Sequence, residues 1–262
     1  MVKKAGKGGV STDYPQALVI QNGVSSSIGY DMEMFVKACD YCVYPGTYGE
    51  DKGSIDMVEI IIHEMGHGLG FISNLANSGL CGSGGPSIWY SFVENYSFAY
   101  IKESLFDAHL YTKEESLHEM FEKLHSTRRY RQPLEMQFVC SHETVHALKR
   151  LLATPDSIYF KTTKGSRVFV ETNENVEVSR VSHTNWGKYY TTLDFLMVPF
   201  AFLHGHVLKE FTRPEDWRTA PFGKLTLEVF ETLGYTVNLN PDPNRSQLAF
   251  YLQMKKHLFN HS

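Results

Sequence analysis

Three side chains in the apolar segment 56–71 have the types and the spacing of a metal centre. His63, Glu64 and His67 form the pattern His-Glu-x-x-His. In a helix, side chains four positions apart lie on one face, so both imidazoles could bind one metal ion. Glu64 would then be placed to take a proton from water bound there. The pattern predicts a helix that carries two zinc ligands and a general base, the alternative being two hydrogen-bonded histidines on a core helix.

The residues after His67 predict how this helix ends and where its pattern departs from a known motif. Gly70 lies three residues beyond His67 and would let the chain leave the helix sharply. In the zinc peptidases called metzincins the motif continues as HExxHxxGxxH, with a third histidine three residues after the glycine. That position is Ser73 here, which is not a zinc ligand. The third ligand therefore lies elsewhere in the chain or is absent.

Two later segments extend the comparison. His183 precedes a Leu-Met-Val-Pro sequence at 196–199, and Leu-Thr-Leu-Glu-Val-Phe-Glu-Thr-Leu-Gly-Tyr at 225–235 predicts a helix that ends at a glycine. Together with the first motif, these segments resemble the leishmanolysin-like metzincins and, more distantly, the matrixins. In the leishmanolysin-like family a long insertion precedes the third histidine, and a methionine follows it in a tight turn beneath the metal. The matching motifs cover 56–71, 182–200 and 225–235.

The resemblance implies a function and a role for each of these residues. His63, His67 and His183 would bind one catalytic Zn²⁺, Glu64 would be the general base, and Met197 would form the Met-turn. The reaction would be hydrolysis of internal bonds in a peptide or protein substrate, and the enzyme would be secreted. The third ligand would follow the second by 116 positions (183 − 67), with an insertion at 74–180 between them.

Other residues could complete or replace this site. Glu94 is an alternative third ligand, as in zincins that use a glutamate from a downstream helix. A second His-Glu-x-x-His pattern occurs at 142–146, where it opens an amphipathic segment without a following glycine. We interpret this second pattern as the polar face of a surface helix. His204 and His206 are further candidates, and we interpret them as part of an exposed loop.

Composition excludes several classes of function. The chain has 262 residues, enough for one large core, and its formal net charge of −4 provides no basic surface for nucleic acid. No apolar run approaches the roughly 20 residues that span a bilayer. The sequence does not predict an oligomeric state. Two disulfides in any of three pairings could form among four cysteines, Cys39, Cys42, Cys81 and Cys140.

The N-terminus leads to a competing hypothesis about function. It carries lysines but no apolar core of a signal peptide, and the 55 residues before the motif are few for the strands expected there. We therefore expect an N-terminally truncated member of the family. A catalytically inactive zinc-binding or interaction protein is the alternative, although the intact pattern at 63–67 argues against it.

The expected fold class is α+β, of the metzincin type. An N-terminal mixed sheet and the active-site helix would form one part, and the Met-turn and final helix would form a C-terminal subdomain. The catalytic domain would extend over 14–240, between a disordered segment at 1–13 and a C-terminal tail at 241–262. We expect a strand at 30–36, helices at 89–109, 113–127 and 143–153, and a hairpin between 158–161 and 167–171.

Overall fold

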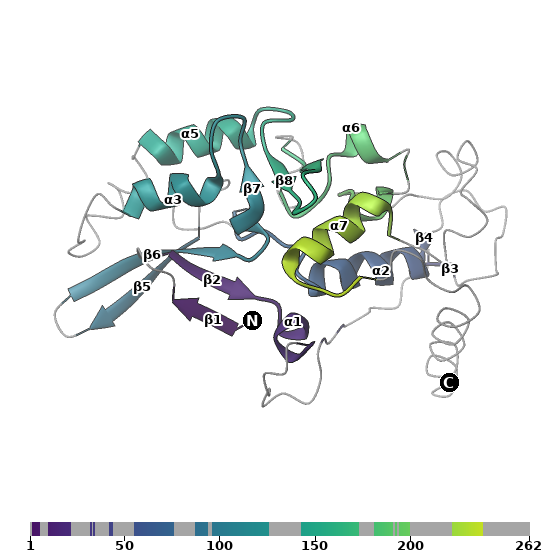
Figure 1. Cartoon of the computed structure of the whole chain (residues 1–262), viewed down its shortest axis with the longest axis horizontal. Coiled ribbons are helices and arrows are strands. Elements are labelled where there is room, and N and C mark those ends of the chain that lie inside the picture. Colours follow the sequence, from purple (N-terminus) through teal and green to yellow (C-terminus); the bar gives the residue numbers. More distant parts are fainter. Residues whose placement is uncertain are drawn as a thin grey trace.

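A computed structural model describes thirteen stretches of the chain and has a mixed α+β architecture with six α-helices in them (Figure 1). The described residues are 2–5, 10–21, 32, 34, 42–43, 55–75, 87–93, 96–125, 143–172, 181–190, 192, 194–199 and 222–237. None of the helices in these stretches is long and apolar enough to cross a membrane.

The expected motif helix is present as α2 (Met57–Gly68), and the chain leaves it at Gly70, as expected. Gly70 has a φ of +105°, the left-handed region that glycine adopts without strain. The amide of Gly70 donates to the carbonyl of His67, and the amide of Phe71 donates to the carbonyl of Gly66. These two bonds form a Schellman motif, which satisfies the last carbonyls of the helix and turns the chain sharply.

The predicted C-terminal helix is α7 (Lys224–Leu233), and it ends in the same way. Gly234 has a φ of +106°, and its amide and that of Tyr235 donate to the carbonyls of Glu231 and Phe230. The rings of Phe230 and Tyr235 lie 6.2 Å apart, which is the apolar contact that accompanies a Schellman motif. Sequence therefore places both helix ends correctly.

A four-stranded mixed sheet, in the order β1-β2-β6-β5, corrects two predictions. β5 (Ser87–Val93) and β6 (Tyr96–Ser104) form an antiparallel hairpin where a helix is expected at 89–109, because aromatic residues at every second position of β6 suit a strand and β6 pairs with β2. β1 (Val2–Ala5) and β2 (Val10–Tyr14) lie in the segment expected to be disordered, and pairing of β2 with β6 gives its backbone partners. Half of this sheet thus comes from the insertion.

Elsewhere in the described part of the insertion, the two other expected helices and the expected hairpin are present. Helices α3 (Leu117–His125) and α5 (Glu143–Leu152) are present, and α3 buries one face through Leu117 and Phe121. β7 (Leu110–Tyr111), β8 (Tyr159–Lys161) and β9 (Arg167–Phe169) form a small antiparallel sheet in that order. The expected 158–171 hairpin is the β8–β9 pair.

The other elements are short. They are α1 (Gln16–Gln21), the parallel pair of β3 (Cys42–Val43) and β4 (Ile55–Asp56), α6 (Trp186–Tyr189), and two 3-10 turns, η1 (Asp107–His109) and η3 (Phe195–Met197). The strand expected at 30–36 lies almost entirely outside the described residues, and Met32 and Met34, which are described, belong to no strand.

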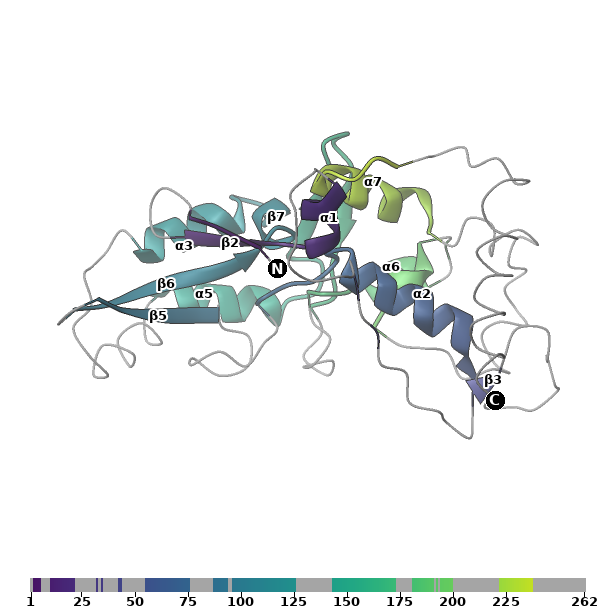
Figure 2. The ribbon, with the colours of Figure 1, turned by 90° about the horizontal axis from the view of Figure 1, so that it is seen from below.

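One core joins the motif helix to the insertion and to α7. The ring of Phe71 lies 4.6 Å from that of Phe106 and 6.5 Å from that of Phe230, and Phe106 lies 4.9 Å from Phe160. The β5–β6 hairpin lies at one end of the long axis, and α2 extends from the middle toward the opposite end, in two perpendicular views (Figures 1 and 2). This aromatic cluster fixes the position at which the chain leaves α2.

Candidate metal centre

Three histidine side chains from two distant segments meet at one point. The Nε2 atom of His63 lies 3.0 Å from that of His67 and 3.1 Å from that of His183, and the last two are 3.2 Å apart. His63 and His67 come from adjacent turns of α2, and His183 comes from the segment before α6. Among the described residues, these three histidines are the group whose side chains could hold a metal ion, and we call them the metal group.

Backbone carbonyls set the tautomer of the two helical imidazoles. Nδ1 of His63 lies 2.5 Å from the carbonyl oxygen of Leu196, and Nδ1 of His67 lies 2.7 Å from that of Phe71. A carbonyl can only accept, so each Nδ1 carries the proton and donates it. Each Nε2 is then unprotonated and has a free lone pair, which is the form that binds a metal.

The spacing of these nitrogens fits a tetrahedral zinc ion. Zn–N bonds of about 2.0–2.1 Å at tetrahedral angles separate two ligand nitrogens by about 3.3 Å. The observed Nε2–Nε2 distances of 3.0, 3.1 and 3.2 Å are close to that value. Since the lone pairs of His63 and His67 converge at this distance, they would repel one another unless a cation lay between them. The residues present therefore fit a metal ion with three imidazole ligands.

Electrostatics at His67 favour the same neutral form. Burial lowers the pKa of His67, the neighbouring His63 lowers it further, and the hydrogen bond to Phe71 and the charge of Glu64 oppose these effects. The net pKa is below its ordinary value. The imidazole is thus held ready to bind without first losing a proton.

His183 is positioned by a short ladder that continues β9. The amide of Glu171 donates to the carbonyl of His183 over 2.9 Å, and Val170 forms an antiparallel bridge with Thr184. The Glu171 carboxylate also accepts from the amide of Trp186. These bonds hold the chain on both sides of His183. Val181, two residues earlier, has a φ of +63°, an unusual conformation for a β-branched residue.

Met197 packs against the motif helix at Gly66, the residue before His67. Its side chain is fully buried, and its carbonyl accepts from the amide of Thr184, next to His183. A Cβ atom at Gly66 would lie 2.5 Å from the Met197 sulfur, so the two segments touch at this point. The contact explains why a glycine stands inside the motif, between Glu64 and His67.

Close packing at Gly66 leads to a testable prediction. Gly66→Ala should destabilise the protein by about 1–3 kcal/mol, because the methyl group overlaps the Met197 sulfur and outweighs the gain in helix propensity. Met197→Val removes that sulfur, so the double variant should recover part of the loss relative to the sum of the two single variants. Urea unfolding of the four proteins measures this coupling. Additive losses would show that Met197 does not pack on Gly66.

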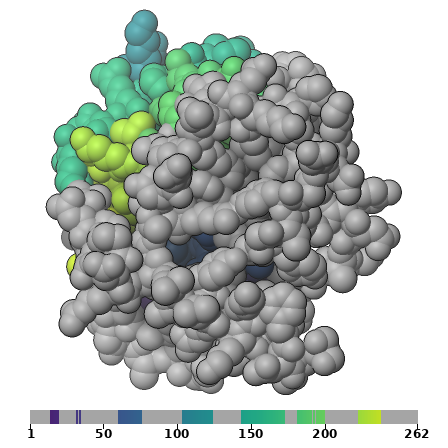
Figure 3. Space-filling view, turned by 90° about the vertical axis from the view of Figure 1, so that its right-hand side faces the viewer, coloured from purple at the N-terminus to yellow at the C-terminus, as the bar shows by residue number. Residues whose placement is uncertain are grey.

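Glu64 is exposed, unlike the three histidines, and lies next to His63 on α2. No hydrogen bond or ion pair of its carboxylate occurs among the described residues, which leaves it able to exchange a proton with water. Atoms of the α2 segment are visible from one face of the molecule (Figure 3). An exposed carboxylate beside three convergent imidazoles is the arrangement that metal-assisted hydrolysis needs.

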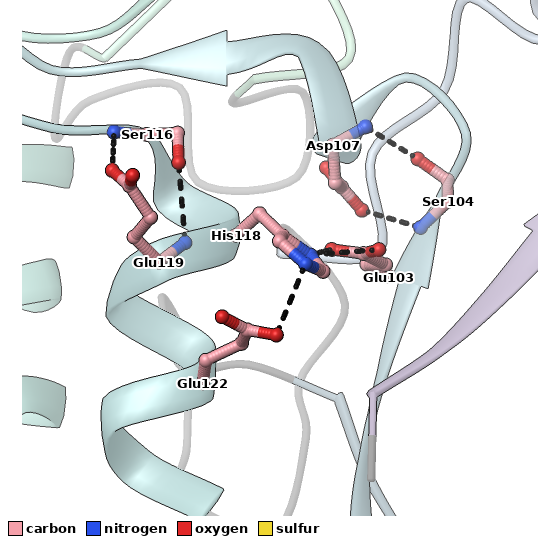
Figure 4. Close-up of polar contacts among 7 residues, drawn as sticks. All are labelled: Glu103, Ser104, Asp107, Ser116, His118, Glu119 and Glu122. Atoms are coloured by element: carbon pink, nitrogen blue, oxygen red, sulfur yellow. Dashed lines mark hydrogen bonds and ion pairs between the residues drawn. The ribbon is translucent and has the colours of Figure 1, made fainter. Parts of the chain in front are cut away.

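Ser73 takes no part in the metal group and instead binds a buried carboxylate that the sequence did not reveal. The Asp107 carboxylate is completely buried and accepts from the Ser73 hydroxyl and from the amides of Asn74 and Ser104. Figure 4 shows Asp107 beside Ser104 at the end of β6. Asp107 thereby ties the segment after α2 to the insertion. No motif marks it, because its role depends on contacts 33 and 34 positions away.

Burial raises the pKa of Asp107 to about 6, and the hydrogen bonds from Ser73, Ser104 and Asn74 only partly oppose this effect. Since the folded-state pKa exceeds its ordinary value of 3.8, the folded protein binds this proton more tightly than the unfolded chain does. The contribution to stability is therefore complete below the unfolded pKa. It is lost as the pH rises through about 6.

Asp107→Asn should remove this pH dependence, which amounts to about 3 kcal/mol for a shift of about two pKa units. The amide can keep the three bonds, because its oxygen can accept from both backbone amides while its nitrogen donates to Ser73. Denaturant unfolding of the metal-free proteins from pH 4 to pH 8 gives the difference in stability. Its dependence on pH should be steepest between the two pKa values. Parallel curves for wild type and variant would contradict this assignment.

A second cluster of titratable groups joins β6 to α3 (Figure 4). Nδ1 of His118 lies 3.0 Å from the buried Glu103 carboxylate, and Nε2 lies 3.6 Å from that of Glu122. Burial lowers the pKa of His118, but the hydrogen bond to Glu103 and the charges of nearby carboxylates outweigh it, so the net pKa is raised. This pair is a structural link between two elements of the insertion.

The described residues of the second His-Glu-x-x-His pattern do not join the metal group. In the second His-Glu-x-x-His pattern, Glu143 and His146 are exposed on α5, whereas Val145 and Leu148 are buried, as expected for a surface helix. Four candidate residues lie outside the described residues: Glu94, His142, His204 and His206. The predicted disulfides also lie outside them, since only Cys42 of the four cysteines is described.

This placement predicts that the second pattern holds no zinc. A His142→Ala/His146→Ala variant should retain the wild-type metal content, because His146 is exposed and belongs to no group of metal-binding side chains among the described residues. Elemental analysis after dialysis measures the content. Loss of the ion in this variant would place the site on α5 instead of α2.

The chain matches no protein-family model, no curated protein and no solved structure.

Proposed function

We propose that this protein is a zinc-dependent endopeptidase of the metzincin type, in which His63, His67 and His183 hold the ion and Glu64 is the general base. The observation that carries the proposal is the convergence of three imidazole nitrogens, two of them held unprotonated by bonds at Nδ1, next to an exposed glutamate. Met197 would support the ligands from below as the Met-turn.

The ligand set favours a catalytic zinc ion. Zinc is commonly bound by imidazole nitrogen, and three protein ligands leave one of four tetrahedral positions open. Structural zinc sites are usually closed by four ligands, most of them cysteines, and need no glutamate beside them. The described residues around the metal group contribute histidines alone.

The residues of the chain divide the work of hydrolysis. A bound zinc ion would supply Lewis acidity, which makes water nucleophilic near neutral pH and polarises a substrate carbonyl. Glu64 would take the proton from the attacking water and pass it to the departing amine. The carbonyls of Leu196 and Phe71 would keep His63 and His67 oriented throughout, since they hold Nδ1.

The remaining parts of the proposal concern context. Substrates would be peptides or proteins, and export from the cell would agree with the resemblance and with four cysteines able to pair. The catalytic domain would extend over 14–240.

Cleavage of an unfolded protein by the zinc-loaded chain tests the function. Hydrolysis of casein should be lost on addition of 1,10-phenanthroline and restored by zinc, because the ion binds reversibly to neutral imidazoles. Bound zinc without any hydrolysis would instead favour the catalytically inactive zinc-binding protein.

A further inference from the structure

The outer face of the β7-β8-β9 sheet alternates aromatic and cationic side chains. Leu110, Phe160 and Val168 point into the core, so their neighbours along each strand point outward. Three rings lie directly across from one another on this side, as the strand register requires, and the central ring, that of Tyr159, is buried between its neighbours. We call this surface the cation–aromatic face; its members are Tyr111, Tyr159, Phe169, Lys161, Arg167 and Lys188.

Each ring on this face is covered by one cation. Lys161 Nζ lies 5.0 Å from the centre of the Tyr111 ring, the Arg167 guanidinium 4.9 Å from that of Tyr159, and Lys188 Nζ 4.7 Å from that of Phe169. The rings of Tyr111 and Tyr159 are stacked 6.2 Å apart. Cation–π contacts of this kind hold the charged groups in place without neutralising them.

Two of the three cations on this face have no carboxylate partner among the described residues. Lys188 pairs with Asp156 over 3.0 Å, but neither Lys161 nor Arg167 has an ion pair among the residues that the structure describes. Both are exposed. In a chain with 29 acidic and 25 basic residues, these fixed cations form a local positive surface that attracts carboxylates.

The cation–aromatic face continues directly into the segment that carries His183. The amide of Asn185 donates to the carbonyl of Phe169, one step along the ladder from the bond between Glu171 and His183. At about 3.3 Å per residue, Arg167 lies roughly 13 Å along this ladder from the residue that pairs with His183. An extended peptide would cover that distance with about four to six residues.

We propose that the cation–aromatic face is a binding site for an acidic segment of the polypeptide substrate, four to six residues from the bond to be cleaved. The inference rests on the proposed function, because it names the substrate class of the same site. Unpaired cations select carboxylates. Because each ring is already covered by a cation, the rings are not open platforms for the stacking of nucleic-acid bases.

Binding is measured with the zinc-loaded Glu64→Gln chain, which needs no turnover. The probe is a fluorescein-labelled peptide with a block of about four Asp and Glu residues about five positions from its centre. A peptide of the same length with Asn and Gln in place of the acids is the control ligand. Anisotropy should show tighter binding of the acidic peptide, weakened by raising the salt from about 0.05 M to about 0.5 M.

Charge reversal locates the site. Lys161→Glu/Arg167→Glu should weaken binding of the acidic peptide about tenfold or more, since two attractions become repulsions. Lys123→Glu/Arg150→Glu, on α3 and α5, changes the net charge equally and should leave the affinity near that of the parent. Zinc content and melting temperature of each variant show that it has folded.

Three outcomes would overturn the inference: equal affinity for acidic and neutral peptides, equal loss in both reversal variants, and preference for a uridine oligonucleotide or phosphatidylserine vesicles. Failure of the proposed function has a different signature. In that case the acidic peptide would bind to the face, yet the wild-type chain would cleave neither peptide.

Discussion

Glu64→Gln should lower the rate of peptide hydrolysis about 10²- to 10⁴-fold while leaving the zinc content unchanged. General-base catalysis commonly contributes a factor of this size, and the amide cannot take a proton from water. The variant should keep its metal because Glu64 lies beside the three histidines that would bind the ion and does not belong to that group. Cleavage of a fluorogenic peptide and elemental analysis of the same sample provide both quantities.

The chain offers a matched control for this experiment. Glu143 is the corresponding residue of the second His-Glu-x-x-His pattern and is exposed on α5. Glu143→Gln should hydrolyse the peptide at the wild-type rate. Wild-type activity in purified Glu64→Gln protein would remove Glu64 from the mechanism.

His183→Ala should reduce zinc affinity by at least about 100-fold. Changes to groups that only orient a ligand already lower affinity 10- to 100-fold, and this substitution would remove one of the three proposed ligands. Competition with a chromophoric chelator measures the affinity, with circular dichroism to show that the fold remains. His118→Ala is a suitable control, since His118 is engaged with Glu103 and not with the metal group.

Unchanged zinc affinity in His183→Ala would move the third ligand to another residue. The candidates would then be Glu94, His204 and His206, each of which could be changed in turn.

Local chemistry determined which elements could be predicted. The motif helix, its exit at Gly70, the end of α7 at Gly234 and the β8–β9 hairpin depend on neighbouring residues, and all are present as expected. The segment 89–109 was predicted wrongly because its many aromatic residues suit a buried helix or a strand, and pairing of β6 with β2 decides between them. β2 likewise owes its order to a distant partner.

The candidate site was predictable to different degrees in its parts. The spacing of His63 and His67 alone places both on one face of a helix. His183 lies 116 positions from His67, so a resemblance to a family, and not periodicity, singled it out. Asp107 could not be anticipated, since a carboxylate in an undistinguished segment becomes important only when the fold buries it.

The long separation between the ligands has a consequence for how such a chain can vary. The entropy of closing a loop rises with the logarithm of its length, so doubling the 116-position interval would cost only about 0.6 kcal/mol. Lengthening within the interval is therefore nearly neutral for the site. A slip of one residue between 169–171 and 183–185 is not, because it would turn the His183 side chain to the opposite side of the ladder. The length of the interval between His67 and His183 can therefore change at little cost, whereas the register between 169–171 and 183–185 cannot.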